Sequence, residues 1–137
     1  MAGAVKFLLD THVWIWSHEA IERLGTRTKR ALSDLEQQRF VSAISTFEIA
    51  RLIDRGLLRF RQPFPQWKED SLQELAATTT DVTHEIAWEA YNLPGAFHND
   101  PADRILVATA RIHDLVLLTA DDLILRYSHV KTLRATR

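Results

Sequence analysis

The chain has 137 residues, 46% of them hydrophobic, with 17 basic and 18 acidic side chains and a formal net charge of −1. This composition predicts one globular domain over residues 1–137 and excludes a polycation, so any contact with nucleic acid needs a local basic patch. There is no cysteine and no apolar run long enough to span a bilayer, which excludes disulfides and thiolate metal sites and favours a cytoplasmic location.

The first part of the chain predicts two buried strands, each followed by a helix. Residues 5–9 are mostly apolar, which is typical of a strand buried on both faces, and the run stops at Asp10. Thr11 is placed to cap the short helix that follows. A basic helix over 25–38 then leads to a second strand at 40–44.

The next segment has the spacing of a helix capping box. Ser45-Thr46-Phe47-Glu48 predicts a helix that begins there and ends near Gly56. An amphipathic helix over 66–77 and a weaker β-prone stretch over 78–82 follow.

The longest predicted helix begins at about residue 100, after a shorter helix and a turn. A helix over 83–91 and a turn bring the chain to Asp100, a favoured N-cap residue. Pro101 suits the first helical position, and Asp103 meets the positive end of the helix dipole. We therefore expect a helix that runs to near His113.

The last elements are a strand at 115–119, a short helix opened by Asp121-Asp122, and a final strand at 130–133. Strands that alternate with helices predict an α/β fold of three layers, α/β/α, with a central, mostly parallel sheet of four to five strands. Ligands of such sheets bind beyond the carboxyl ends of the strands.

Four acidic residues fall at that edge of the predicted sheet. Asp10 follows the first strand, Glu48 lies one turn beyond the second, Asp103 opens the long helix and Asp121 follows the strand at 115–119. Alone, Asp10 also suits a plain turn, Glu48 suits a capping box, and Asp103 and Asp121 suit the first turn of a helix. Two carboxylates about 4 Å apart repel by roughly 4 kcal/mol at an effective dielectric near 20. A divalent cation removes that repulsion, and oxygen ligands without cysteine favour Mg²⁺ or Mn²⁺.

Two assignments stay open at this point. Asp100 fits its capping role, with a water-mediated contact to a metal as the alternative. Asp121 and Asp122 both suit the last acidic position, and the spacing from Thr119 favours Asp121.

Four segments, in this order, resemble the motifs of PIN-domain ribonucleases, and the VapC-like toxins of toxin–antitoxin modules match best. They are Leu8-Leu9-Asp10-Thr11-His12, Ser45-Thr46-Phe47-Glu48-Ile49, His98-Asn99-Asp100-Pro101-Ala102-Asp103-Arg104 and Leu118-Thr119-Ala120-Asp121. The resemblance implies a PIN-like fold and a Mg²⁺- or Mn²⁺-dependent endoribonuclease. It also implies a homodimer that a cognate antitoxin inhibits.

The resemblance also assigns roles to residues. Its acidic metal site corresponds to Asp10, Glu48, Asp103 and Asp121, with Asp100 as an additional acid. Thr11 and Thr119 match positions whose hydroxyls support that site. Contacts to RNA or antitoxin are expected from four arginines: Arg51, Arg55, Arg59 and Arg104.

Other interpretations remain at this stage. The arginines also suit solvated helix faces, and Arg104 suits an ion pair with a neighbouring acid as well as a phosphate contact. A domain that binds RNA or a partner without cleaving it, a nuclease that acts on DNA, and phosphoryl transfer through Asp10 are the competing functions.

Overall fold

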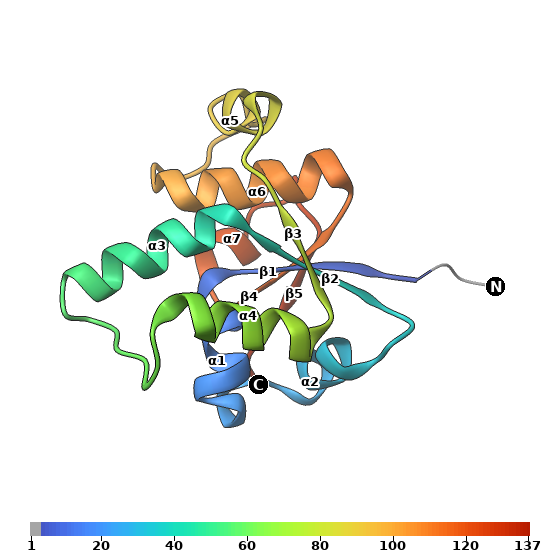
Figure 1. The fold of residues 1–137 in the computed structure, drawn as a ribbon. Coiled ribbons are helices and arrows are strands. Elements are labelled where there is room, and N and C mark those ends of the chain that lie inside the picture. The colour runs from blue at the N-terminus through green and yellow to red at the C-terminus, as the bar shows by residue number, and fades with distance from the viewer. Residues whose placement is uncertain (1–3) are drawn as a thin grey trace.

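The computed structural model describes residues 4–137, whose five strands form one parallel sheet in the order β3-β2-β1-β4-β5 (Figure 1). The strands are β1 (Lys6–Leu9), β2 (Gln38–Ser42), β3 (Ala77–Thr80), β4 (Val116–Thr119) and β5 (Thr132–Arg134). All four pairings are parallel, so the predicted α/β fold is confirmed.

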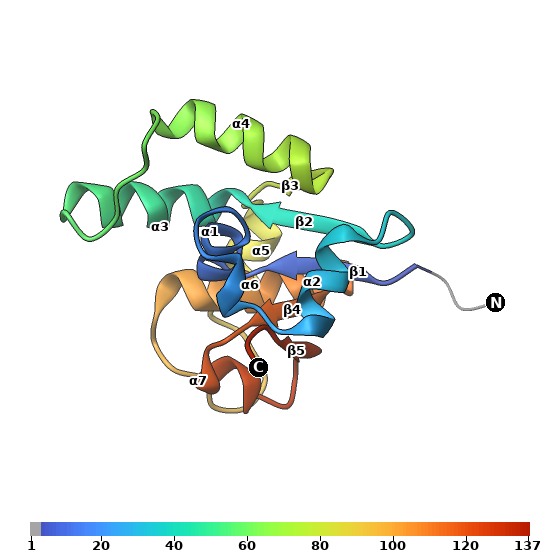
Figure 2. The same cartoon turned by 90° about the horizontal axis from the view of Figure 1, so that it is seen from below.

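Helices cover both faces of this sheet, as two views at right angles show (Figures 1 and 2). They are α1 (Thr11–Glu19), α2 (Thr26–Ser33), α3 (Ala43–Asp54), α4 (Phe64–Leu75), α5 (His84–Glu89), α6 (Pro101–His113) and α7 (Asp122–Leu125), with a 3₁₀ turn, η1 (Ile21–Arg23). Between residues 4 and 137, none of these helices is both long and apolar enough to cross a bilayer.

The strands alternate their side chains between two cores, as strand geometry requires. On β1, Leu9 packs into a core with Trp14 of α1 and Trp67 of α4. Leu8 points to the other core, which it shares with Leu106 of α6. The apolar runs of the sequence are strands buried on both faces because helices cover the sheet on each side.

The order in which the strands are added to the sheet changes sides at β1. From β1 the chain moves outward to β2 and β3, and then crosses back to β4 on the other side of β1. Open α/β sheets bind ligands at the carboxyl ends of the strands where this reversal occurs. The carboxyl ends of β1 and β4 are therefore the expected place for a site.

Two helix starts differ from the sequence prediction. Asp10, not Thr11, caps α1, because its carboxylate accepts from the backbone N–H of Thr11. The predicted capping box at 45–48 is wrong: α3 begins at Ala43, with the Ser42 hydroxyl accepting from Ile44 N. Glu48 therefore lies in the second turn of α3, and its carboxylate is not used for capping.

Several boundaries also moved by a few residues. The basic helix predicted over 25–38 ends at Ser33, and the strand predicted at 40–44 is β2, which begins at Gln38. The helix predicted from residue 66 begins at Phe64. None of these shifts changes the order of the elements.

Candidate active site

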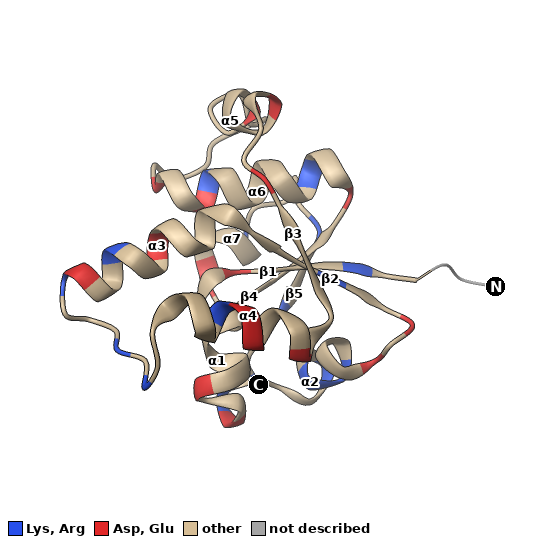
Figure 3. Ribbon diagram, in the orientation of Figure 1, with Lys and Arg blue, Asp and Glu red and all other residues tan. Residues whose placement is uncertain are grey.

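The four acids proposed from the sequence line one pocket at the carboxyl ends of β1 and β4. Its volume is about 320 Å³. It is lined by Asp10, His12, Trp16, Glu48, Asp103, Ala120 and Asp121. In the ribbon, the acidic positions after β1, in α3 and at the start of α6 lie on the same side of the sheet (Figure 3). Four carboxylates that are far apart in sequence thus meet on the edge where the fold is expected to bind ligands.

Asp10 is the most buried of these acids, with only 8% of its surface exposed. Its Oδ1 accepts from Thr11 N at 2.7 Å, and its Oδ2 accepts from the Thr119 hydroxyl at 2.6 Å. The Thr119 hydroxyl oxygen also accepts from Asp121 N at 3.0 Å. Thr119 therefore ties the ends of β1 and β4 together and fixes the positions of both acids.

Glu48 is oriented by a buried hydroxyl pair. The Thr11 hydroxyl donates to Glu48 Oε1, and its oxygen lies 2.8 Å from the hydroxyl of Ser45. Thr11 and Ser45 are both essentially inaccessible to solvent. The support expected from Thr11 is therefore directed at Glu48, and Ser45 is a supporting residue that the sequence analysis did not identify.

Asp103 lies in the first turn of α6, as predicted. Asp100 caps that helix, since its Oδ1 accepts from Asp103 N at 3.1 Å, and this supports its structural interpretation. The other side of Asp103 faces a histidine of the preceding loop, to which the sequence analysis assigned no role. His98 Nε2 lies 3.1 Å from Asp103 Oδ2.

The structure separates Asp121 from its neighbour Asp122. Asp121 lines the pocket, and its Oδ1 accepts from Leu123 N at 2.7 Å as the cap of α7. Asp122 is exposed and pairs with Arg134 at 3.1 Å. Asp121 is therefore the acid that faces the other three.

Three of the carboxyls, those of Asp10, Glu48 and Asp103, have pKa values raised above their ordinary range. Burial raises the pKa of Asp103 to about 8, and the charges of the surrounding acids add to the shift. Burial also raises the pKa of Glu48 to about 7, against the opposing hydrogen bond from Thr11. The pKa of Asp10 is raised mainly by burial, although the Thr119 hydroxyl lowers it. The shifts share one cause: negative charges with too little water around them.

Removal of one carboxylate should reduce the electrostatic repulsion among these acids. For protein freed of divalent metal by EDTA, each raised pKa means that the folded state binds the proton more tightly than the unfolded state. The stability from these protons is complete below their ordinary pKa values of 3.8 and 4.5 and is lost as pH rises toward about 8. Wild-type stability should fall between about pH 4 and about pH 8, and Asp103→Asn should reduce that fall by on the order of 1 kcal/mol.

Thermal unfolding of both proteins across this pH range measures the effect. The difference between their melting temperatures should grow steadily toward alkaline pH, in favour of Asp103→Asn. Parallel curves would show that Asp103 titrates as an ordinary surface acid.

The donor set fits a hard divalent cation, because carboxylate oxygens are the ligands that Mg²⁺ and Mn²⁺ prefer. In residues 4–137, the side chains do not yet form a group of three that would hold an ion as they stand. As they stand, Asp10 is in contact with Thr119, Glu48 with Thr11, and Asp103 with His98. The pocket thus has the chemistry of a cation site, with Asp10 and Glu48 held by hydrogen bonds and Asp103 in contact with His98.

The arginines expected to contact RNA or antitoxin fall into two groups. Arg51, Arg55 and Arg59 are exposed on α3 and the segment after it, which project beyond the sheet on the side of the carboxylates (Figures 1 and 3). Arg104 is different, because its guanidinium donates to three backbone carbonyls, those of Ala90, Phe97 and His98. We therefore reassign Arg104 from phosphate contact or acid pairing to anchoring the loop before α6.

Two further residues of the pocket were not predicted to be functional. His12 and Trp16 lie one turn apart on α1, with ring centroids 5.9 Å from each other. The guanidinium of Arg23 stacks 4.4 Å above Trp16. His12 and Trp16 are four residues apart, so they lie on the same face of α1. Because the helix starts directly after Asp10, this face borders the acids, and the spacing is the sequence signal that could have identified both residues.

Comparison with known proteins agrees with this geometry. The family model for the PIN domain matches residues 7–130. Ribonuclease VapC22 of Mycobacterium tuberculosis is 35% identical over 124 residues, which cover 89% of this chain and 92% of that protein.

Solved structures share the fold at lower identity. FitAcB from Neisseria gonorrhoeae superposes with a TM-score of 0.66 at 20% identity, covering 93% of this chain and 96% of that one. A toxin–antitoxin complex from Klebsiella pneumoniae gives a TM-score of 0.63 at 21% identity, covering 93% and 95%. These matches extend over nearly the whole chain, so the similarity includes all four segments that carry the acids.

Proposed function

Because this chain belongs to the PIN-domain family, as a VapC-type ribonuclease toxin of a toxin–antitoxin system, we propose that it cleaves RNA with Mg²⁺ or Mn²⁺ held by Asp10, Glu48, Asp103 and Asp121. The observation that carries this proposal is the convergence of the four carboxylates in one pocket at the carboxyl ends of β1 and β4. The raised pKa values of Glu48 and Asp103 support it, since a cation would offset the repulsion between the acids.

The bound ion would act as a Lewis acid on the phosphodiester and lower the pKa of a bound water. The chain's own residues supply the frame for this chemistry. Asp10 is the best-fixed ligand, since hydrogen bonds from Thr11 N and the Thr119 hydroxyl hold both of its oxygens. Burial raises the pKa of Glu48 to about 7, which suits a group that orients or deprotonates the attacking water.

The supporting residues act through these acids. Thr119 positions Asp10 and Asp121 together, and Thr11 with Ser45 positions Glu48. Asp100 caps α6 and adds negative charge beside Asp103 without lining the pocket. We assign it a structural role first, with any metal contact made through water.

Metal binding is measured most directly by its effect on unfolding. Addition of MnCl₂ to EDTA-treated protein should raise the melting temperature, because a ligand that binds only the folded state stabilises it by about 2.7 kcal/mol at 100 times its Kd. Asp10→Asn should lose most of this increase, whereas Asp122→Asn should keep it. An equal response of all three proteins would remove Asp10 from the metal site.

The same proposal includes two protein partners, a cognate antitoxin and a second copy of this chain. The projecting α3–α4 arm carries Arg51, Arg55 and Arg59, and a hollow of about 470 Å³ lies between α1 and α4 beside Trp67. We propose this arm as the contact surface for a cognate antitoxin, in the cytoplasm where RNA is available.

The homodimer is proposed from exposed aromatic residues. Phe47, Trp88 and Tyr91 are 68%, 74% and 61% exposed, which is unusual for aromatic side chains of this size. They come from α3, α5 and the turn after α5. The mass of the protein in solution, compared between wild type and Trp88→Ser, tests whether this surface pairs two copies.

A further inference from the structure

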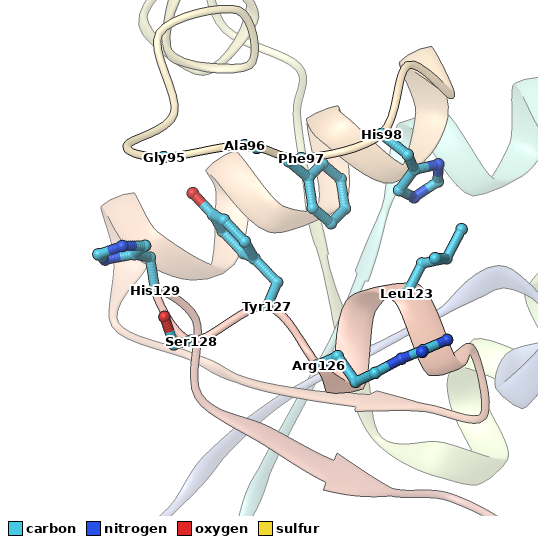
Figure 4. A pocket seen from close by; sticks show the side chains of 9 residues that line it. All are labelled: Gly95, Ala96, Phe97, His98, Leu123, Arg126, Tyr127, Ser128 and His129. Atoms are coloured by element: carbon cyan, nitrogen blue, oxygen red, sulfur yellow. The ribbon is translucent and has the colours of Figure 1, made fainter.

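A separate hollow, which we call the loop pocket, lies beside Asp103 and Asp121 of the carboxylate pocket. Its volume is about 380 Å³. It is formed between the loop at 95–98 and the segment at 123–129, which face each other across it (Figure 4). Its lining is Gly95, Ala96, Phe97, His98, Leu123, Arg126, Tyr127, Ser128 and His129. None of these residues is acidic, in contrast to the four carboxylates of the pocket beside it.

Each wall of the loop pocket contains a residue that contacts an acid of the candidate active site. On the loop side, His98 Nε2 lies 3.1 Å from Asp103 Oδ2. On the other side, Leu123 N donates to Asp121 Oδ1 at 2.7 Å. A strand of RNA whose phosphodiester reaches the carboxylates can therefore pass directly into the loop pocket with its neighbouring nucleotide.

The loop pocket is held in shape without a ligand. The Arg104 guanidinium donates to three carbonyls of the segment before α6, at 2.7–3.0 Å. The Tyr127 hydroxyl donates to the carbonyl of Pro94, which links the two walls. Gly95 adopts the left-handed conformation, with φ of 68°, where the chain turns into the loop. A preformed site loses less entropy when it binds, so this rigidity favours binding.

Its side chains combine a free cation with an apolar wall. Arg126 is exposed, and its Nε donates a hydrogen bond to the backbone carbonyl of Asp122 at 3.2 Å. Within residues 4–137 it takes part in no salt bridge. His129 is also exposed, and Leu123 is 50% exposed. The ring of Phe97 is half-buried against Tyr127, with 4.8 Å between the ring centroids.

This combination matches the chemistry of a single nucleotide. Arginine neutralises a phosphate, and an aromatic or aliphatic surface receives an unstacked base. The carboxylates of the neighbouring pocket repel every RNA phosphate except one that is bound through a cation. A positive charge one nucleotide away offsets that repulsion where the strand leaves the site.

We propose that the loop pocket binds the RNA nucleotide that adjoins the cleaved phosphodiester, with its phosphate at Arg126 and its base against Phe97 and Leu123. This inference rests on the proposed ribonuclease function and adds to it a subsite that positions the strand. Arg126 and Phe97 are positioning residues in this arrangement, since neither reaches the carboxylates.

Binding of a labelled single-stranded oligouridylate, followed by fluorescence anisotropy at several salt concentrations, tests the subsite. All proteins carry Asp10→Asn, so that the RNA stays intact, and circular dichroism checks their folding. Arg126→Ala should bind about fivefold more weakly, and its plot of log K against log salt should be shallower by about 0.7, the value for one phosphate contact on a single strand. The matched control is Arg30→Ala, an exposed arginine that lines a hollow with Val5 and Gln37. It should behave like the parent.

The base contact has a different signature. Phe97→Leu keeps an apolar side chain but removes the ring, so affinity should fall by about fivefold or more while the salt dependence stays unchanged. Equal affinity and salt dependence in the parent, Arg126→Ala and Phe97→Leu would overturn the proposal. Loss of antitoxin binding in these variants, with RNA binding intact, would also overturn it and assign the pocket to protein recognition.

The binding test is independent of the metal-site proposal. If Asp10→Asn still cleaves RNA, the metal ligands are wrong, and the same titrations done in EDTA still measure the pocket. If Asp10→Asn is inactive but Arg126→Ala binds like its parent, the active site stands and the subsite does not.

Discussion

Asp10→Asn and Asp103→Asn are expected to lower metal-dependent RNA cleavage by more than about 100-fold, the upper end of losses from outer-shell changes around a metal. Asparagine keeps the size of the side chain but removes the negative charge that binds a cation. The fold should survive in the first variant, because asparagine is also a favoured N-cap and can still accept from Thr11 N. Gel assays of RNA cleavage with Mn²⁺, together with circular dichroism, measure both effects.

Asp122→Asn is the matched control for this experiment. It removes a carboxylate next to Asp121, but that carboxylate is exposed and pairs with Arg134. Exposed ion pairs are worth roughly 0–1 kcal/mol, so the variant should cleave RNA nearly as well as wild type. Loss of activity in Asp122→Asn, with activity retained in Asp121→Asn, would show that the wrong member of this pair has been assigned.

The same assay decides between the competing activities. RNA and DNA of identical sequence, offered separately, show whether the 2′-hydroxyl matters to the enzyme. A folded wild-type protein that binds RNA but cleaves neither substrate with Mg²⁺ or Mn²⁺ would favour a binding domain. Phosphate recovered on Asp10 itself would instead indicate an aspartyl intermediate.

The sheet and the position of the acids could be predicted because they depend on local patterns. The run at 5–9 is apolar on both faces and ends in a charge, so both a buried strand and an acid at its carboxyl end follow from the sequence. The same is true of the strand before Thr119 and of Asp100-Pro101 at the start of α6. Once these strands are parallel, their ends must meet at one edge.

What could not be predicted depends on contacts between distant residues. Ser42 and Ser45 are both suitable N-caps, and the choice follows from packing: Ser45 is buried against Thr11, 34 residues earlier in the chain. The role of Glu48 depends on that same contact, because the Thr11 hydroxyl orients its carboxylate. No spacing rule along the chain contains this information.

Arg104 is the clearest example of a role that the sequence conceals, and its replacement should have the largest effect on stability. Arg104→Ala leaves three carbonyls without their donor, those of Ala90, Phe97 and His98. Unsatisfied acceptors cost about 1–3 kcal/mol each when buried, and these are partly accessible, so a total loss of about 3 kcal/mol is expected. Thermal and urea unfolding measure this loss directly.

The activity of Arg104→Ala should also fall, by roughly 10-fold, because the released loop carries His98 away from Asp103. Arg104→Lys should recover little, since an ammonium group cannot reproduce the planar fork that reaches three carbonyls. Arg55→Ala removes the same charge from an exposed position on the α3 side and should change stability by less than about 0.5 kcal/mol. If Arg104→Ala and Arg55→Ala were equally stable, the guanidinium would not be anchoring the loop, and the rigidity of both the active site and the loop pocket would need another source.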